Sequence, residues 1–149
     1  MHGQYIKDLS FENPRAPQSL IEQKQPQLNL NVNVATKQFE AKTFEVTLTI
    51  EANATTPEKE PLFMLELVYA GTVTLGDVPQ DAFGPLLFIE TPRLLFPFAR
   101  AVVANATREA GVPPLNIAPV DFVALYRQQL EANGGKMPGV TPGGPVGHA

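Results

Sequence analysis

Cysteine is absent from this sequence of 149 residues, and histidine is scarce. Without cysteine there can be no disulfide bond, thiolate nucleophile or cysteine-based zinc site, and such a chain suits a reducing compartment. The two histidines, His2 and His148, stand beside the chain ends, where residues are usually mobile. Most pairs of nucleophile and base therefore cannot be built, and we expect neither an enzyme nor a bound cofactor or metal.

Long apolar runs and clusters of basic residues are also missing. Residues 1–7 contain no apolar stretch fit for a signal peptide, and no segment approaches the roughly 20 apolar residues that span a bilayer. The net charge is −4, from 15 acidic and 11 basic residues, and no group of Lys and Arg is clustered to neutralise nucleic-acid phosphates. We expect a soluble, cytoplasmic protein that inserts into no membrane and binds no nucleic acid.

The length fits a single domain, and the composition, with 44% apolar and 17% charged residues, is that of a globular protein. Glycine and proline are concentrated near the end, where six of the 11 glycines and three of the 15 prolines lie within residues 133–149. Such a segment cannot bury enough apolar surface to offset its loss of conformational entropy. We predict a folded domain over residues 1–133 and a flexible tail over residues 134–149.

Three segments of the first half alternate apolar and polar side chains with a period of two, which predicts strands with one buried face. They are residues 4–12, 28–34 and 44–51. In the first segment, strict alternation assigns Tyr5, Lys7, Leu9 and Phe11 to one face and Ile6, Asp8, Ser10 and Glu12 to the other. A crossover over residues 13–26 and a short hairpin connection over residues 35–43 would join the three strands.

Residues 61–75 differ, because both alternating sets of this segment are apolar. Leu62, Met64 and Val68 share one face with Glu66, whereas Phe63, Leu65, Leu67 and Tyr69 share the other. A strand that is apolar on both sides needs cover on both sides. Either a partner subunit or an apolar ligand, or other elements of the same chain, could supply that cover.

The second half of the chain predicts two helices. Thr91 can cap a helix that begins at Pro92, and Pro97 interrupts this helix, so that its regular part could start there. The second helix is predicted over residues 119–133. Residues 76–90 are predicted as a loop that contains a short helical turn.

Three acidic residues, Asp8, Glu12 and Glu66, form the first candidate site. On strand faces that point to solvent, they could be an electrostatic docking surface for a basic partner. The pattern alone favours the plainer alternative of a solvated sheet face, since most surface charge serves only solvation.

Aromatic side chains form the second candidate site. Most of them are expected in the core, which is the usual place of large apolar residues. Phe83 and Phe88 lie in the predicted loop, where they are harder to bury and could line a groove for apolar segments. Core and groove both stay open for these two residues.

Three blocks of the sequence together resemble the SecB family of bacterial export chaperones. They are Tyr5-Ile6-Lys7-Asp8-Leu9-Ser10-Phe11-Glu12-Asn13-Pro14, Leu94-Leu95-Phe96-Pro97-Phe98-Ala99-Arg100 and Leu115-Asn116-Ile117-Ala118-Pro119-Val120-Asp121-Phe122. Their order and spacing resemble the family's first strand with its crossover, the entry to its first helix and the approach to its second. The resemblance covers nearly all of the chain apart from the tail.

This resemblance implies an α+β fold with a four-stranded antiparallel sheet, a crossover connection and two helices, assembling as a homotetramer that is a dimer of dimers. It also implies an ATP-independent chaperone that binds unfolded preproteins in apolar grooves, keeps them translocation-competent and delivers them to the motor ATPase SecA. The groove residues assigned on this basis are Phe11, Phe44, Phe63, Tyr69, Phe83 and Phe88.

In family members, acidic residues of the outer sheet face receive a basic, zinc-bearing segment of SecA, so that the zinc belongs to the partner. By matching positions, the resemblance implies this role for Asp8, Glu12 and Glu66, with the apolar Met64 as a neighbouring contact. The tail departs from the polar tails of the family. Three alternatives stay open: a SecB-like general holdase that is not tied to SecA, a small α+β enzyme with a carboxylate site, and a purely structural oligomer with no affinity for unfolded chains.

Overall fold

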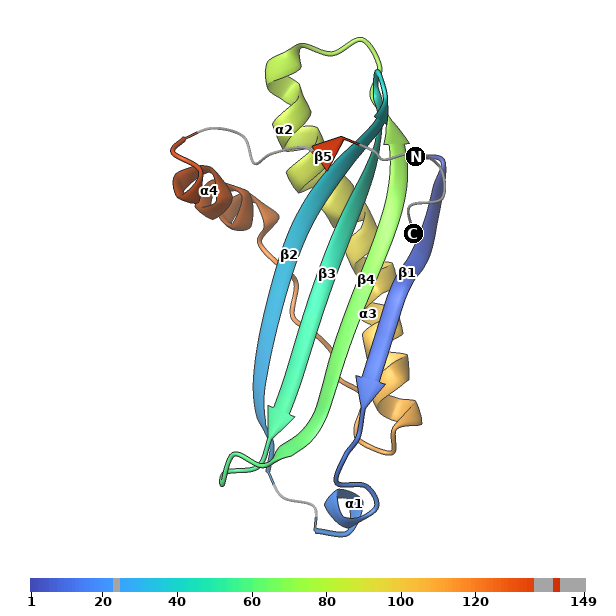
Figure 1. The fold of residues 1–149 in the computed structure, drawn as a ribbon, viewed down its shortest axis with the longest axis vertical. Helices are drawn as coiled ribbons and strands as arrows, with labels where there is room; N and C mark the ends of the chain where they lie inside the picture. Colours follow the sequence, from blue (N-terminus) through green and yellow to red (C-terminus); the bar gives the residue numbers. More distant parts are fainter. Residues whose placement is uncertain (23–24, 136–140, 143–149) are drawn as a thin grey trace.

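The computed structural model describes residues 1–22, 25–135 and 141–142. Its centre is an antiparallel sheet of four long strands in the order β1-β4-β3-β2, and helices cover one face of this sheet (Figure 1). The strands are β1 (Gly3–Glu12), β2 (Gln27–Glu40), β3 (Thr43–Thr55) and β4 (Pro61–Thr74). A short strand, β5 (Thr141–Pro142), pairs in parallel with the end of β2. The predicted α+β fold with a four-stranded antiparallel sheet is confirmed.

Helical segments occupy the crossover and the second half of the chain. The crossover between β1 and β2 contains α1 (Gln18–Glu22). A continuous helical stretch after β4 consists of η1 (Gln80–Ala82), α2 (Phe83–Pro85), the π-helical η2 (Leu86–Glu90) and α3 (Thr91–Glu109). The last helix, α4 (Phe122–Ala132), lies beside β2, where the Gln129 amide donates to the carbonyl of Val34 at 3.2 Å (Figure 1).

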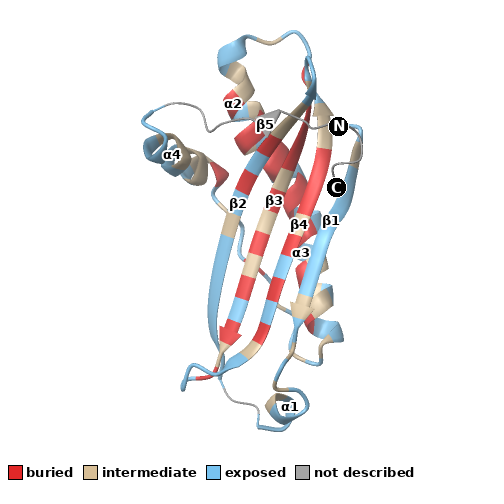
Figure 2. Cartoon of the chain, viewed as in Figure 1, coloured by how far each residue is buried: buried red, intermediate tan, exposed pale blue. Residues whose placement is uncertain are grey.

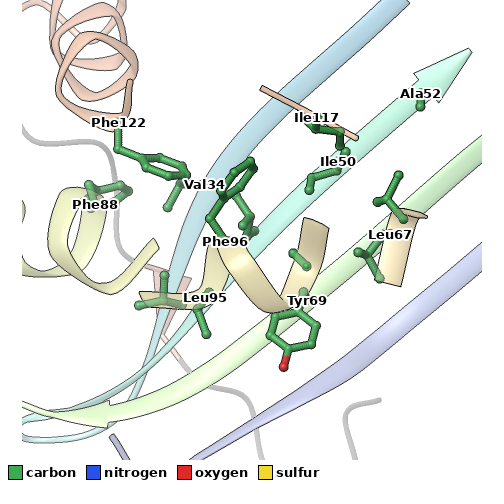
Figure 3. Packing of buried hydrophobic residues seen from close by; sticks show 14 of the residues in the cluster. Val34, Ile50, Ala52, Leu67, Tyr69, Phe88, Leu95, Phe96, Ile117 and Phe122 are labelled. Atoms are coloured by element: carbon green, nitrogen blue, oxygen red, sulfur yellow. The ribbon is translucent and has the colours of Figure 1, made fainter. Parts of the chain in front are cut away.

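The core lies between α3 and the inner face of the sheet, defined here as the face that α3 covers (Figures 2 and 3). Alternate residues of β3 and β4 point to this face and are buried, because successive side chains of a strand point to opposite sides. Leu48, Leu67 and Leu95 are fully buried. Phe96 of α3 meets Phe122 of α4 edge to face with 6.0 Å between ring centroids, which ties α4 to the core.

The prediction of strict alternation along β1 is wrong, because the strand contains a β-bulge. Ile6 pairs with Tyr69 and Asp8 pairs with Val68, which leaves Lys7 as an extra residue. The outer face therefore carries Tyr5 and Lys7 together with Asp8, Ser10 and Glu12, and the inner face carries Ile6 with Leu9 and Phe11. An alternating pattern gives no signal for a bulge whose side-chain contacts come from a distant strand.

The predicted start of the long helix is also wrong. Thr91 does not cap this helix, since the residue before it is already helical and the Thr91 hydroxyl donates to the carbonyl of Leu86 at 2.8 Å. The helical stretch begins at Gln80, so that most of the predicted loop is helical, and Pro97 lies inside α3. Proline lacks an amide hydrogen and cannot donate within a helix, and the π-helical turn Leu86–Glu90 ends two residues before Pro92.

Two other boundaries differ slightly from their predictions. β2 continues to Glu40, so that the hairpin to β3 turns over residues 41–42 and is shorter than predicted. α4 begins after Asp121, whose carboxylate accepts a hydrogen bond from the Ala124 amide at 3.0 Å and so caps the helix.

The predicted flexible tail lies mostly outside the described residues. Within it the structure describes residues 134–135, two glycines with positive φ that follow α4, and the two residues of β5. The division of the chain into a domain over residues 1–133 and a tail therefore stays a prediction.

Candidate functional site

The outer face of the sheet carries three adjoining rows of side chains across β1, β4 and β3. Asp8, Val68 and Thr49 form the first row, Ser10, Glu66 and Glu51 the second, and Glu12, Met64 and Asn53 the third. The four docking residues predicted from the sequence, Asp8, Glu12, Met64 and Glu66, therefore meet on two neighbouring strands of one face. All four side chains are exposed.

A shallow hollow of about 190 Å³ lies within the second and third rows. Its lining residues are Ser10, Glu12, Glu51, Asn53, Met64, Leu65 and Glu66. Met64 is 39% exposed and has carboxylates on both neighbouring strands. An exposed apolar side chain among carboxylates is complementary to a segment that carries basic side chains beside an apolar one.

Glu51 belongs to this surface, although the sequence prediction leaves it out. It stands directly opposite Glu66 in the pairing of β3 with β4, and like charges in that position destabilise a sheet. The nine residues of the three rows include four carboxylates and no basic side chain that would neutralise them. The sequence did hold a signal, since Glu51 ends an alternating segment on its polar side, but the pairing register was unknown.

Glu45 lies on the same face toward the other end of β3 and is only 4% exposed. Its carboxylate accepts a hydrogen bond from the Tyr5 hydroxyl and another from Lys7 Nζ, the latter at 2.6 Å. Burial opposes the charged form of Glu45, but the hydrogen bonds from Lys7 and Tyr5 and the charges of Lys7 and Lys37 outweigh burial and lower its pKa. Burial, the hydrogen bond to Glu45 and the charge of Glu45 raise the pKa of Tyr5.

These electrostatics bear on the alternative of a carboxylate enzyme. A general acid that works near neutral pH needs a carboxyl group whose pKa is raised, and the buried Glu45 has the opposite shift. Within residues 1–22, 25–135 and 141–142, no cluster of three or more His, Asp or Glu side chains could hold a metal ion. In the same part of the chain, no helix is long and apolar enough to cross a membrane.

A larger, apolar hollow of about 870 Å³ opens where the crossover, the ends of the strands and the connection between α3 and α4 meet. Its apolar lining comprises Leu20, Pro26, Leu28, Ala54, Leu62, Phe63, Val112, Pro113, Pro114 and Leu115. Around it, Leu20 is 37% exposed, Ile21 is 74% exposed, and Leu28 and Leu30 are about two-fifths exposed. An apolar hollow with exposed apolar side chains beside it is typical of a binding site.

Two of the six predicted groove aromatics lie at this hollow. Phe63 lines the hollow, and the half-buried Phe11 stacks on Phe63 with 5.5 Å between ring centroids. The prediction did not include the aliphatic and proline residues that form most of the lining. Apolar residues of a loop give little signal from the sequence, because only the fold shows what they face.

The other four aromatics lie away from the hollow. Phe44 and Phe88 are each 2% exposed and Tyr69 is 8% exposed, which places all three in the core (Figure 3 shows Tyr69 and Phe88). Phe83 is half-buried and packs edge to face against Phe44 at 6.0 Å. Phe88 stacks on Tyr126 of α4 at 5.6 Å between centroids.

Comparison with known proteins identifies the family of the chain. The family model of the preprotein translocase subunit SecB matches residues 1–133. The protein-export protein SecB of Bradyrhizobium sp. (strain BTAi1) is 57% identical over 130 residues, which are 87% of this chain and 80% of that protein. The protein-export protein SecB of Afipia carboxidovorans is 56% identical over 128 residues, which are 85% of this chain and 79% of that protein.

A solved structure has the same fold. It is a SecB-like chaperone of Mycobacterium tuberculosis in complex with a ChAD peptide from an antitoxin, with a TM-score of 0.66 and 15% sequence identity, and the match covers 80% of this chain and 88% of that one. At such low identity the likeness concerns the fold alone. The family model and the two close relatives decide the rest: the chain belongs to the SecB family of protein-export chaperones.

Proposed function

We propose that this protein is an ATP-independent chaperone of the cytoplasm that binds unfolded preproteins, keeps them translocation-competent and delivers them to the SecA motor. The single observation that carries the proposal is the separation of two surfaces: an apolar hollow at the end of the sheet and an acidic patch on the outer face. One can hold a client while the other meets a partner. The function needs no cofactor and no catalytic residue.

Client binding would use the apolar hollow and the exposed apolar side chains around it. Burial of apolar surface contributes about 25 cal/mol per Å², so each local contact is weak and depends little on the client's sequence. Unfolded chains expose many apolar segments at once, and several subunits binding one client would raise the overall affinity through avidity. A folded protein offers no such segments and would be ignored.

The proposed client contacts are Phe63 and Phe11 together with the lining of the hollow, and the half-buried Phe83 away from the hollow. The buried side chains of Phe44, Tyr69 and Phe88 would support these surfaces from the core, since their exposed fractions leave little area for a client.

SecA docking would use the acidic outer face. Asp8, Glu12 and Glu66 supply carboxylates, and Met64 supplies an apolar contact among them. Glu51 adds a fourth charge opposite Glu66. Repulsion between these unneutralised acids would be relieved by basic side chains of the partner, which gives the docking surface an electrostatic reason to bind.

The proposed assembly is a homotetramer, a dimer of dimers. β1 forms one edge of the sheet, so its outward backbone groups are available to a strand of a second copy. On α3, Leu94 is 60% exposed and Phe98 is 52% exposed, one helical turn apart. Apolar side chains so placed on a long helix support burial against another subunit.

The test is size-exclusion chromatography with light scattering, with and without a permanently unfolded preprotein. We expect a mass of four chains and co-elution with the unfolded protein but not with its folded form. Leu20→Asp, which places a charge in the hollow, should weaken co-elution, whereas Phe39→Asp, at an exposed apolar residue outside the hollow, should not. Equal loss in both variants, or binding of the folded form, would contradict the proposed groove.

A second titration separates export from general holding. SecA is added to wild-type protein and to a variant with Asp8→Lys and Glu66→Lys. Weaker SecA binding with unchanged client binding supports delivery to SecA. Unchanged SecA binding would leave a general holdase as the better description.

A further inference from the structure

Glu45 is unusual among the acidic residues of the outer face because it is buried. It stands on the central strand β3, directly opposite Lys37 of β2 and Thr72 of β4, and is 4% exposed. A buried carboxylate costs folding free energy unless it is paired and hydrogen-bonded. The hydrogen-bond partners of its two carboxylate oxygens therefore indicate the role of the residue.

Both oxygens are used by the edge strand. One accepts from the Tyr5 hydroxyl and the other from Lys7 Nζ at 2.6 Å, and both donors reach across β4 from β1. Tyr5 pairs with Ala70 of β4, whose small side chain leaves the way across that strand open. Two contacts between strands that are not neighbours thus converge on one carboxylate.

The bulge makes this convergence possible. Without it, the pairing of Asp8 with Val68 would continue to Lys7 with Tyr69, and the Lys7 side chain would point to the inner face. Ile6 now holds the place opposite Tyr69 and is 48% exposed, so a lysine there would stay in water, but the buried Glu45 would lose that donor. The extra residue turns both Tyr5 and Lys7 outward, where Glu45 accepts from both.

We infer that Glu45 is a positioning residue that holds the β-bulge at Lys7 in place and with it the register of residues 3–7 at the sheet edge. The remainder of β1 has its own anchor, because Phe11 stacks on Phe63 at 5.5 Å. The two halves of the edge strand are therefore held by different contacts, one polar and on the outer face, the other apolar and on the inner face. The role of Glu45 is independent of the docking partner proposed above.

The experiment measures amide hydrogen exchange by NMR in the full chain. In Glu45→Leu, which keeps the bulk but removes the acceptor, the protected amides of residues 3–7 should exchange at least tenfold faster. The amides of Leu9 and Phe11 should change less than twofold. Tyr5→Phe and Lys7→Met each remove one donor and should give smaller accelerations over the same residues, and these two variants decide the matter if Glu45→Leu fails to fold.

A second readout separates positioning from general stability. The pKa of the Tyr5 phenol should be lower in Glu45→Leu than in the wild type, because the hydrogen bond and the charge of Glu45 are removed while burial remains. The ring-carbon resonance of Tyr5 follows this titration. Glu45→Gln keeps one acceptor oxygen, so the exchange rates of its residues 3–7 should lie between those of the wild type and those of Glu45→Leu. Glu40→Gln, an exposed acid on β2, is the charge-matched control and should leave residues 3–7 unchanged. Unaltered exchange in Tyr5→Phe and Lys7→Met, or equal acceleration along all of β1, overturns the inference.

Discussion

The inner and outer faces of the sheet are made by the same strands, but different forces decide their residues. On the inner face of β3, alternate residues from Val46 to Ala52 are 0% exposed under α3, and shape and apolar area decide what fits. On the outer face, Glu51 and Glu66 stand opposite each other at a cost to the sheet. Stability explains the first face, whereas the second has features that stability alone disfavours, which is typical of a binding surface.

The largest expected difference between the two faces is in stability. Leu48→Ala on the inner face of β3 should lower the free energy of unfolding by about 2–5 kcal/mol, because it leaves a cavity in the core. Asn53→Ala on the outer face of the same strand should stay within about 0.5 kcal/mol of the wild type. Urea unfolding followed by circular dichroism measures both, and equal midpoints for the two variants would remove the contrast.

The next effect concerns binding. Glu66→Lys should weaken the affinity for the basic C-terminal segment of SecA about tenfold, which is about 1.4 kcal/mol. It should leave stability unchanged or raise it, since the repulsion with Glu51 is replaced by attraction. Calorimetric titration at two salt concentrations is the measurement, and the loss should shrink as salt screens the charges.

Glu109→Lys is the matched control for this variant, because Glu109 is an exposed acid on α3. It should bind the segment like the wild type. A tenfold loss there as well would mean that net charge, rather than the outer face, governs binding.

A smaller effect concerns α4, which borders the inner face. Asp121→Ala removes the side chain that caps this helix and should lower the free energy of unfolding by about 1 kcal/mol. Asp121→Asn keeps a capping oxygen and should cost less. Thermal unfolding compares the two variants, and an alanine variant as stable as the asparagine one would show that the cap contributes nothing.

The smallest effect is the pH dependence of the Glu45 cluster. Because the pKa of Glu45 is lowered in the folded protein, its contribution to stability is present above its unfolded pKa and is lost as the pH falls through its folded pKa. The groups facing it are Tyr5, Lys7 and Lys37. Denaturant midpoints of wild type and Glu45→Gln should differ at pH 7 and converge below the ordinary carboxyl range. A constant difference at all pH values would contradict this.

Much of the fold could be predicted because periodicity is a local property. The four strands and both helices follow from spacings of two and near four residues, and the resemblance to SecB pointed to the acids that we propose for docking. The predictions for β1 and for the start of the long helix were wrong because they used only local patterns. The bulge at Lys7 depends on Glu45, and the helical stretch begins at Gln80 and includes a π-helical turn over Leu86–Glu90 that periodicity does not predict.

The candidate site divides in the same way. The sequence shows directly that Glu12 and Glu66 are acidic and that Met64 is apolar. It does not show that Glu51 lies on the same surface, because this depends on the register of β3 with β4. The aromatics of the groove could not be separated from those of the core. Phe63 and Phe44 look alike in sequence, and only the packing of the crossover and of the α3–α4 connection leaves one at a hollow.

The sequence by itself determined that thiol chemistry is excluded, which segments hold the four long strands and the two main helices, and to which family the chain belongs, since composition, period and motif are properties of neighbouring residues. Tertiary structure alone decided which face Tyr5 and Lys7 take, that Glu45 is buried and which apolar residues stay open to a client. The physical reason is that these outcomes depend on contacts between residues far apart in the chain, such as Tyr5 and Glu45 at a separation of 40. Local pattern carries no information about which distant side chain completes a hydrogen bond or covers a surface.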